Sequence, residues 1–355
     1  MRIGVLTGGG DAPGLNAVIR AIVKHGVGHK GWQVLGIEDS FNGLFESPYG
    51  IQHMTLQSCS GLLSRGGTVL GTTNKGDPFA WGPEKVNMAP QIPKAMAELG
   101  LEGLVVIGGD GTQAIAQRLM DETGIKCVGV PKTIDNDLSA TDRTFGFQSA
   151  VDVATEALDR LHTTAESHDR VIILEVMGRD AGHIALHAGI GGGADCIVIP
   201  EIPYDIDRLC AKIDARRAVG RFFTLIIVAE GAKPAGGKPA GYKRKHGKGV
   251  VRVGGPGPAL AQALAMKREV DVRVTVLGHL QRGGSPCPYD RVLSTRLGIG
   301  AVDLIEQGRW GEIAVLKNNT IVGVPIRDAI ATYRLVDPDG EMVRTARAVG
   351  IEFGG

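Results

Sequence analysis

The feature that most constrains the fold is an alternation of short β-rich runs with longer amphipathic stretches. Near-continuous apolar runs are typical of strands buried on both faces, and the stretches between them have helical spacing. This strand–helix–strand rhythm predicts the α/β class, with parallel, doubly wound sheets covered by helices on both faces. The predicted strands are 3–6, 33–37, 103–107, 127–130, 171–176, 196–199, 223–228 and 272–277. The predicted helices are 15–27, 91–99, 112–123, 147–165, 206–218 and 259–267.

Length and composition indicate the broad class of protein. A chain of 355 residues that is 43% hydrophobic can build two cores, so we expect two domains. The net charge of +1 argues against a general nucleic-acid binder, which needs a basic excess. The sequence starts with an apolar run instead of a charged leader, and no apolar run approaches the ~20 residues of a membrane span. Five cysteines without a Cys-x-x-Cys pair fit reduced thiols, so we expect a cytoplasmic protein without zinc.

Glycines gather where the predicted strands end. The first cluster, Thr-Gly-Gly-Gly-Asp-Ala-Pro-Gly at 7–14, joins a strand to a helix. Glycines let backbone amides face an anion, and the following helix N-terminus adds positive potential. The spacing is neither Gly-x-Gly-x-x-Gly nor a Walker A loop, because Pro13 occupies the third glycine position and no Gly-Lys-Ser/Thr follows. On this pattern alone, a plain strand-to-helix turn is an equally good interpretation.

Two further motifs add carboxylates to such loops. Gly-Gly-Asp-Gly-Thr at 108–112 places Asp110 beside a phosphate cradle, which indicates an intervening Mg²⁺, although a helix cap would also explain it. Pro-Lys-Thr-Ile-Asp-Asn-Asp at 131–137 places Asp135 and Asp137 two residues apart, on one side of an extended segment. One carboxylate could take a hydroxyl proton while Lys132 offsets phosphoryl charge. In isolation, an Asx-rich turn explains this segment better.

Arginines near other strand ends suit a sugar phosphate, because the planar guanidinium binds phosphate oxygens in pairs. A single arginine is more often a surface residue, but several arginines at the ends of strands favour an anion site. Two segments, 49–90 and 231–258, break the rhythm, and the basic run at 243–246 is interpreted as part of a solvated loop. The candidates in this group are Arg170, Met177, Gly178, Arg179, Glu230, Arg273, His279 and Arg282.

Together these segments resemble the 6-phosphofructokinase family over residues 1–297. The motif at 108–112 followed by the motif at 131–137 is a far more specific signal than either motif alone. The segments 159–168 and 175–179 resemble the bacterial mixed-substrate subgroup, which contains ATP and pyrophosphate users. The resemblance implies a glycolytic kinase that uses Mg²⁺ and phosphorylates fructose 6-phosphate at C1, giving fructose 1,6-bisphosphate.

The resemblance also implies an architecture. Two doubly wound Rossmann-like domains would hold the active site in the cleft between them. Residues 1–146 with about 281–330 would bind the phosphoryl donor and Mg²⁺, and 147–280 with about 331–355 would bind fructose 6-phosphate. The protein would be a homodimer or homotetramer with shared active sites, without nucleic-acid or membrane partners.

Site residues follow from the same motifs. In the catalytic group, Asp135 would be the general base on the C1 hydroxyl, assisted by Asp137, with Lys132 and Thr133 beside it. The donor would be contacted by Gly10, Lys75, Gly109, Asp110, Gly111 and Thr112, with Asp110 as the Mg²⁺ ligand. Fructose 6-phosphate would be bound by Thr133, Ile134, Asp135, Met177, Gly178, Arg179, Glu230, His279 and Arg282, and by Arg170 and Arg273 of a neighbouring subunit.

Two positions bear on the donor. Gly111 resembles the ATP users, whereas pyrophosphate users tend to carry an aspartate at this position. An aspartate would fill the space that the nucleotide α-phosphate needs, and its charge would repel that phosphate. Lys132 resembles pyrophosphate users, but a lysine does not exclude ATP, so we expect ATP. An effector pocket would involve Arg20, Lys24 and Arg221, and a neutral His162 in place of an arginine weakens it.

Other classes of function stay open on the sequence. A nucleotide-binding oxidoreductase would use Glu38 or Asp39 on a ribose, but the Gly-x-Gly-x-x-Gly motif is missing. An NAD or lipid kinase could use the Gly-Gly-Asp-Gly loop, without a need for the sugar-phosphate arginines. An inactive binding subunit is less consistent with the presence of both Asp110 and Asp135.

Overall fold

The chain forms two compact units in a computed structural model that describes residues 1–238, 240–246 and 249–355, with the backbone alone described for the strand residues within 242–253. Unit 1 comprises Met1–Ile134, Leu138–Gln148 and Arg282–Tyr333. Unit 2 comprises Asp135–Asp137, Ser149–Gln281 and Arg334–Gly355. The segment Asp135–Asp137 therefore groups with unit 2, whereas the predicted donor domain included it.

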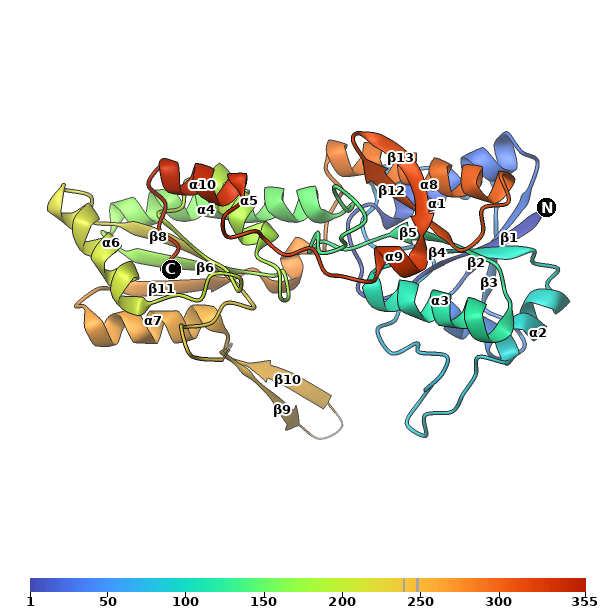
Figure 1. Cartoon of the computed structure of the whole chain (residues 1–355), viewed down its shortest axis with the longest axis horizontal. Coiled ribbons are helices and arrows are strands. Elements are labelled where there is room, and N and C mark those ends of the chain that lie inside the picture. The colour runs from blue at the N-terminus through green and yellow to red at the C-terminus, as the bar shows by residue number, and fades with distance from the viewer. Residues whose placement is uncertain (239, 247–248) are drawn as a thin grey trace. The chain divides into compact units, whose positions relative to one another are not determined.

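Unit 1 is built on a seven-stranded sheet with the order β13-β12-β5-β4-β1-β2-β3 (Figure 1). Its central strands run parallel, and the two edge strands β3 and β13 are antiparallel to their neighbours. The strand order reverses between β1 and β4, so the loops that follow these two strands meet at a topological switch point. The strands are β1 (Arg2–Thr7), β2 (Gln33–Ile37), β3 (Ile51–Met54), β4 (Gly103–Gly108), β5 (Cys127–Pro131), β12 (Glu312–Lys317) and β13 (Thr320–Pro325).

Helices cover both faces of this sheet because the buried strand residues alternate between two cores. Val105 of β4 packs in the core that contains α1 and α8, and its neighbour Val106 packs in the core that contains α2 and α3. The helices of unit 1 are α1 (Leu15–Gly28), α2 (Gln91–Glu98), α3 (Asp110–Thr123), α8 (Pro288–Glu306) and the short α9 (Ile326–Ala329), with 3₁₀ turns η1 (Ser40–Leu44) and η2 (Leu62–Ser64).

Unit 2 has a four-stranded parallel sheet in the order β11-β6-β8-β7. The strand order again reverses at the first strand, between β6 and β11, which makes a second switch point. The strands are β6 (Val171–Val176), β7 (Cys196–Val198), β8 (Thr224–Ala229) and β11 (Val272–Val276). The helical elements are α5 (His183–Gly191), α6 (Ile206–Ala218), α7 (Pro256–Lys267), η3 (Gly278–Gln281) and α10 (Glu341–Ala348), together with most of α4 (Phe147–Ser167).

The predicted doubly wound α/β class is confirmed, and each predicted strand and helix is present with bounds shifted by three residues or fewer. The prediction of an irregular loop at 231–258 was wrong for its central part. Tyr242–His246 (β9) and Gly249–Val253 (β10) pair as an antiparallel hairpin in unit 2 (Figure 1). The side chains of the basic run at 243–246 lie outside the described part of the structure.

Two global features bear on function. Among the described residues, every helix is too short or too polar to span a membrane. The five cysteines are free thiols, and burial raises the pKa of Cys127 to about 12, so this thiol stays protonated at neutral pH.

Helix α6 gives a direct test of the unit 2 core. Ile213 is fully buried in the core beside β6 and β8, whereas Val219, directly after the helix, is 76% exposed. We expect Ile213→Ala to lower the free energy of unfolding by about 2–5 kcal/mol, because it leaves a cavity in a packed core. Val219→Ala should change it by less than about 0.5 kcal/mol. Urea denaturation followed by circular dichroism compares the two, and equal effects would contradict the assigned packing.

Candidate active site

The first glycine loop is fixed by backbone hydrogen bonds to two other segments of unit 1. The amide of Gly8 donates to the carbonyl of Ile107 at 2.9 Å, and the amide of Gly9 donates to the carbonyl of Thr73 at 3.2 Å. The hydroxyl of Thr72 donates back to the carbonyl of Gly9 at 2.7 Å. The loop after β1, the end of β4 and the 72–73 segment therefore form one connected layer at the switch point of unit 1.

Two cationic side chains converge on Gly10 in this layer. The ammonium group of Lys132 donates to the Gly10 carbonyl oxygen, and the Lys132 side chain is almost fully buried. The guanidinium of Arg282 lies so close to Gly10 that any Cβ at this position would overlap it. The buried Nε of Arg282 has no hydrogen-bond acceptor among the described residues. Positive charge thus gathers where backbone amides and a helix start already favour an anion.

The second glycine loop begins α3 directly beside the first. Gly109 is the residue before the helix, and a Cβ at Gly8 would lie 2.6 Å from the Thr112 methyl group, so the two loops touch. Gly111 is different, because a Cβ there would have no atom within 4 Å. The carboxylate of Asp110 accepts a hydrogen bond from the Tyr333 hydroxyl at 2.7 Å. Gly109, Asp110, Gly111 and Thr112 are therefore brought together with Gly10 in unit 1.

The third motif leaves β5 and carries its polar side chains into buried positions. The amide of Lys132 donates to the carbonyl of Gly108 at 2.9 Å, and the Thr144 hydroxyl donates to the carbonyl of Thr133 at 2.7 Å. Asp135 is 4% exposed and Asp137 is 6% exposed, while Asn136 between them has a left-handed backbone with φ of 56°. Buried carboxylates at the tip of a tightly held turn are costly unless partners stabilise them, which is typical of functional groups.

Unit 2 places one such partner beside Asp135. Arg179 Nε lies 3.8 Å from Asp135 Oδ2, and the amide of Arg179 donates to Glu230 Oε1 at 2.9 Å. Gly178 before it has φ of 141°, and a Cβ there would lie 2.5 Å from the Ala181 carbonyl oxygen, so only glycine fits the turn. The predicted residues Asp135, Gly178, Arg179 and Glu230 are therefore neighbours at the carboxyl ends of β6 and β8.

The loop after β11 reaches the same edge of this sheet. The amide of Met177 donates to the side-chain oxygen of Gln281 at 2.8 Å, and Gln281 is fully buried. His279, in the same 3₁₀ turn, is exposed. Sequence reasoning missed Gln281, although its position between two predicted site residues was an available signal.

Arg170 and Arg273 lie elsewhere in unit 2. They are at the beginning of β6 and β11, the end of each strand opposite to Met177 and His279. Both pair with Asp271: Arg170 Nε lies 2.7 Å from Asp271 Oδ2, and Arg273 Nη2 lies 3.1 Å from Asp271 Oδ1. Within one chain, the structure does not bring these two arginines to the other sugar-phosphate candidates of unit 2.

Lys75 lines a pocket of its own in unit 1. This pocket has a volume of about 600 Å³, and Trp81 is among the residues that line it. The Lys75 amide donates to the Thr73 hydroxyl at 3.0 Å, and Thr73 is bonded to the first glycine loop as described above. The remaining lining residues are Asn42, Asp77, Ala80, Gly82 and Pro83.

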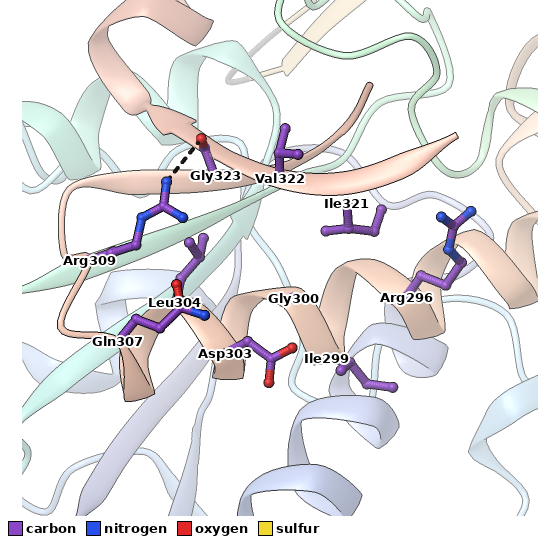
Figure 2. Close-up of a pocket in the computed structure, with 10 residues that line it drawn as sticks. All are labelled: Arg296, Ile299, Gly300, Asp303, Leu304, Gln307, Arg309, Ile321, Val322 and Gly323. Carbon is purple, nitrogen blue, oxygen red and sulfur yellow. Dashed lines mark hydrogen bonds between the residues drawn. The ribbon is translucent and has the colours of Figure 1, made fainter. Parts of the chain in front are cut away.

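A second cavity of unit 1, of about 360 Å³, lies between α8 and β13 (Figure 2). Arg309, at one end of this cavity, donates to the Gly323 carbonyl and forms an ion pair with Glu312. No predicted site residue is among the residues that line it, so it is separate from the catalytic candidates. The lining residues are Arg296, Ile299, Gly300, Asp303, Leu304, Gln307, Arg309, Ile321, Val322 and Gly323.

The glycines of the first loop differ in a way that can be tested. Gly14 has φ of 111°, and a Cβ there would lie 2.5 Å from Ser294 Oγ and 2.8 Å from the Phe145 ring. We expect Gly14→Ala to lower the free energy of unfolding by about 2 kcal/mol or more, through backbone strain and overlap with packed groups. At Gly10 a methyl group meets only the end of the flexible Arg282 side chain, so Gly10→Ala should cost less than about 1 kcal/mol. Thermal denaturation measures both, and a larger loss for Gly10→Ala would refute this assignment.

Comparison with known proteins indicates the family of this chain. The family model described as phosphofructokinase matches residues 2–305. The chain is 49% identical to the ATP-dependent 6-phosphofructokinase 1 of a Synechocystis species, over 99% of this chain and 98% of the relative. It is 46% identical to the pyrophosphate–fructose 6-phosphate 1-phosphotransferase of Streptomyces coelicolor, over the whole length of both.

A solved structure shows the same fold. The Pichia pastoris phosphofructokinase in the T-state matches with a TM-score of 0.82 and 32% identity, over 93% of this chain. This chain spans about a third of the length of that Pichia chain, 35%. The family match over most of the sequence, together with full-length relatives near 50% identity, shows that this chain belongs to the phosphofructokinase family.

Proposed function

We propose that this protein transfers the γ-phosphoryl group of ATP to the C1 hydroxyl of fructose 6-phosphate, giving fructose 1,6-bisphosphate and ADP. The observation that carries the proposal is the buried carboxylate of Asp135, 3.8 Å from Arg179, whose amide is held by Glu230. A proton acceptor is thus paired with a cation suited to a phosphorylated sugar and with a carboxylate suited to sugar hydroxyls. Full-length relatives with the name 6-phosphofructokinase support the same reaction.

In this mechanism the base and the cations of the chain have separate roles. Asp135 accepts the proton of the C1 hydroxyl while the C1 oxygen of the sugar attacks the γ-phosphorus of ATP. The bond between this phosphorus and the leaving oxygen of ADP breaks in the same step. Asp137 orients the reacting hydroxyl, and Thr133 and Ile134 line the sugar. Lys132, buried beside the Gly10 carbonyl, offsets negative charge on the transferring group. Met177, Gly178, Arg179, Glu230, His279 and Arg282 would hold the sugar phosphate.

The donor would lie against the two glycine loops of unit 1. Gly10, Gly109, Gly111 and Thr112 present backbone at a helix start, where phosphate oxygens are favoured. Among the described residues there is no cluster of three or more His, Cys, Asp or Glu side chains that could hold a metal. Mg²⁺ does not need such a cluster, because it usually takes one or two protein carboxylates together with substrate phosphates. Asp110 would be that ligand, and Mg²⁺ would neutralise charge on the donor phosphates.

Two observations favour ATP over pyrophosphate. A Cβ at Gly111 would have no atom within 4 Å, so the loop leaves space beside the phosphate cradle. The pocket with Lys75 and Trp81 could receive an aromatic base, which pyrophosphate lacks. Two observations favour the alternative: the ammonium group of Lys132 contacts the Gly10 carbonyl in the proposed donor loop, and the Streptomyces coelicolor relative is named for pyrophosphate. A pyrophosphate-dependent enzyme is therefore the second candidate function.

Initial rates with fructose 6-phosphate and Mg²⁺ separate these donors. We expect a higher kcat/KM with ATP than with pyrophosphate for the wild-type protein. Gly111→Asp should lower kcat/KM for ATP by at least about tenfold, because its carboxylate enters the open space and repels phosphate. The same variant should affect pyrophosphate less. Activity mainly with pyrophosphate would mean that Lys132 decides the donor and that the argument from Gly111 is wrong.

The role of Asp135 can be tested apart from the donor. We expect Asp135→Ala to lower kcat by roughly 10²–10⁴-fold, the usual contribution of a general base. Binding of fructose 6-phosphate, measured by calorimetry, should stay within roughly threefold of wild type, because Arg179 and Glu230 remain. Near-normal turnover in this variant would exclude Asp135 as the base.

The position of Arg170 and Arg273 bears on assembly. Because both lie at the opposite end of β6 and β11 from the sugar candidates, we propose that they serve the site of a neighbouring subunit in a homodimer or homotetramer. We also propose a cytoplasmic location, as expected for a glycolytic enzyme with buried free thiols.

The oxidoreductase alternative is weaker, since the Glu38 carboxylate already accepts a hydrogen bond from Gln52 at 2.7 Å.

A further inference from the structure

Asp110 has a partner that the sequence motifs did not indicate. The hydroxyl of Tyr333 donates to Asp110 Oδ2 at 2.7 Å, within unit 1, although 223 positions separate the two residues in the chain. The Tyr333 residue is 61% exposed, so the burial of its ring does not explain its placement. The hydrogen bond to a carboxylate is charge-assisted and is therefore stronger than one between neutral groups.

The backbone around Tyr333 is held on both sides. The Thr332 and Ser139 hydroxyls lie 3.1 Å apart, and Tyr333 forms a β-bridge with Leu138. In unit 2, the amide of Arg334 donates to the Asp137 carbonyl at 2.8 Å. An exposed tyrosine is ordinarily free to change rotamer, but here its Cα is fixed by contacts with the segment that follows the catalytic motif. The hydroxyl is thus presented to Asp110 from an anchored position.

We propose that Tyr333 is a positioning residue for Asp110, which it holds in the rotamer from which the carboxylate would bind a divalent cation. This inference rests on the proposed function, in which Asp110 is the Mg²⁺ ligand. A carboxylate on a helix N-terminus otherwise samples several staggered χ1 wells, and ordering it on binding costs free energy. The tyrosine hydroxyl removes part of that cost before the cation and the donor arrive.

Tyr333→Phe deletes only the hydroxyl, and Tyr49→Phe is its matched control. The Tyr49 hydroxyl also donates to a carboxylate of unit 1, Glu98 Oε2, at 2.8 Å. Neither Tyr49 nor Glu98 belongs to the proposed site. The probe is Mn²⁺ binding in the presence of ADP, measured by electron paramagnetic resonance without turnover. We expect Tyr333→Phe to weaken Mn²⁺ binding by at least about tenfold, as for loss of one hydrogen bond to a charged group. Tyr49→Phe should bind as wild type.

Kinetics provide a second readout. Tyr333→Phe should raise the Mg²⁺ concentration needed for half-maximal rate by a similar factor and leave KM for fructose 6-phosphate unchanged. Unchanged or tighter Mn²⁺ binding in Tyr333→Phe would overturn the positioning role.

The variant Asp110→Asn shows whether a negative result concerns the role of Tyr333 alone or the proposed metal site as a whole. If Asp110→Asn loses Mn²⁺ binding while Tyr333→Phe keeps it, only the role of Tyr333 is wrong. If Asp110→Asn binds Mn²⁺ as wild type, Asp110 is not the metal ligand and the proposed donor site fails with it.

Discussion

The parallel pairing of β1, β4 and β5 is the constraint on which the site of unit 1 depends. Gln113, fully buried on α3, donates to the carbonyls of Val106, Gly108 and Val130, which ties the ends of β4 and β5 to the helix that follows. Because these strands end at the same edge, their loops must meet, and each loop carries chemistry that is weak alone. A helix start, open glycines, a carboxylate and a buried lysine lie together only through this register, and we propose that they form one anion site.

The proposed sugar-phosphate site of unit 2 depends on the same principle. Its sheet also has a switch point at its first strand, and the loops after β6, β8 and β11 supply Arg179, Glu230 and Gln281. Here the groups are a guanidinium, a carboxylate and an amide, which suit the phosphate and hydroxyl groups of a sugar. The segment Asp135–Asp137 belongs to this unit by its packing, although it leaves a strand of unit 1. The proposed base is therefore carried on a covalent connection between the two units.

Much of the fold was predictable because the signals are local. Strands buried on both faces give short apolar runs, and amphipathic helices give a clear period, so their bounds were found within three residues. Helix α5 was missed because it is apolar on all sides and has no polar face to reveal its period. The β9–β10 hairpin was missed because charged residues in a glycine- and proline-rich stretch are typical of a loop. In isolation the Pro131–Asp137 motif is typical of an Asx turn, and only the structure shows that Asp135 and Asp137 are buried.

The sequence by itself determined the class of fold, the motifs and the resemblance to one enzyme family, because these depend on residue type and spacing. Only the tertiary structure decided which groups are neighbours, since contacts distant in sequence leave no local pattern. It placed the Arg282 guanidinium and the Lys132 ammonium on Gly10, the Arg179 side chain beside Asp135, and the Tyr333 hydroxyl on Asp110. It also showed that Arg170 and Arg273 lie apart from the other candidate residues for the sugar phosphate, because the two ends of a parallel strand lie at opposite edges of the sheet.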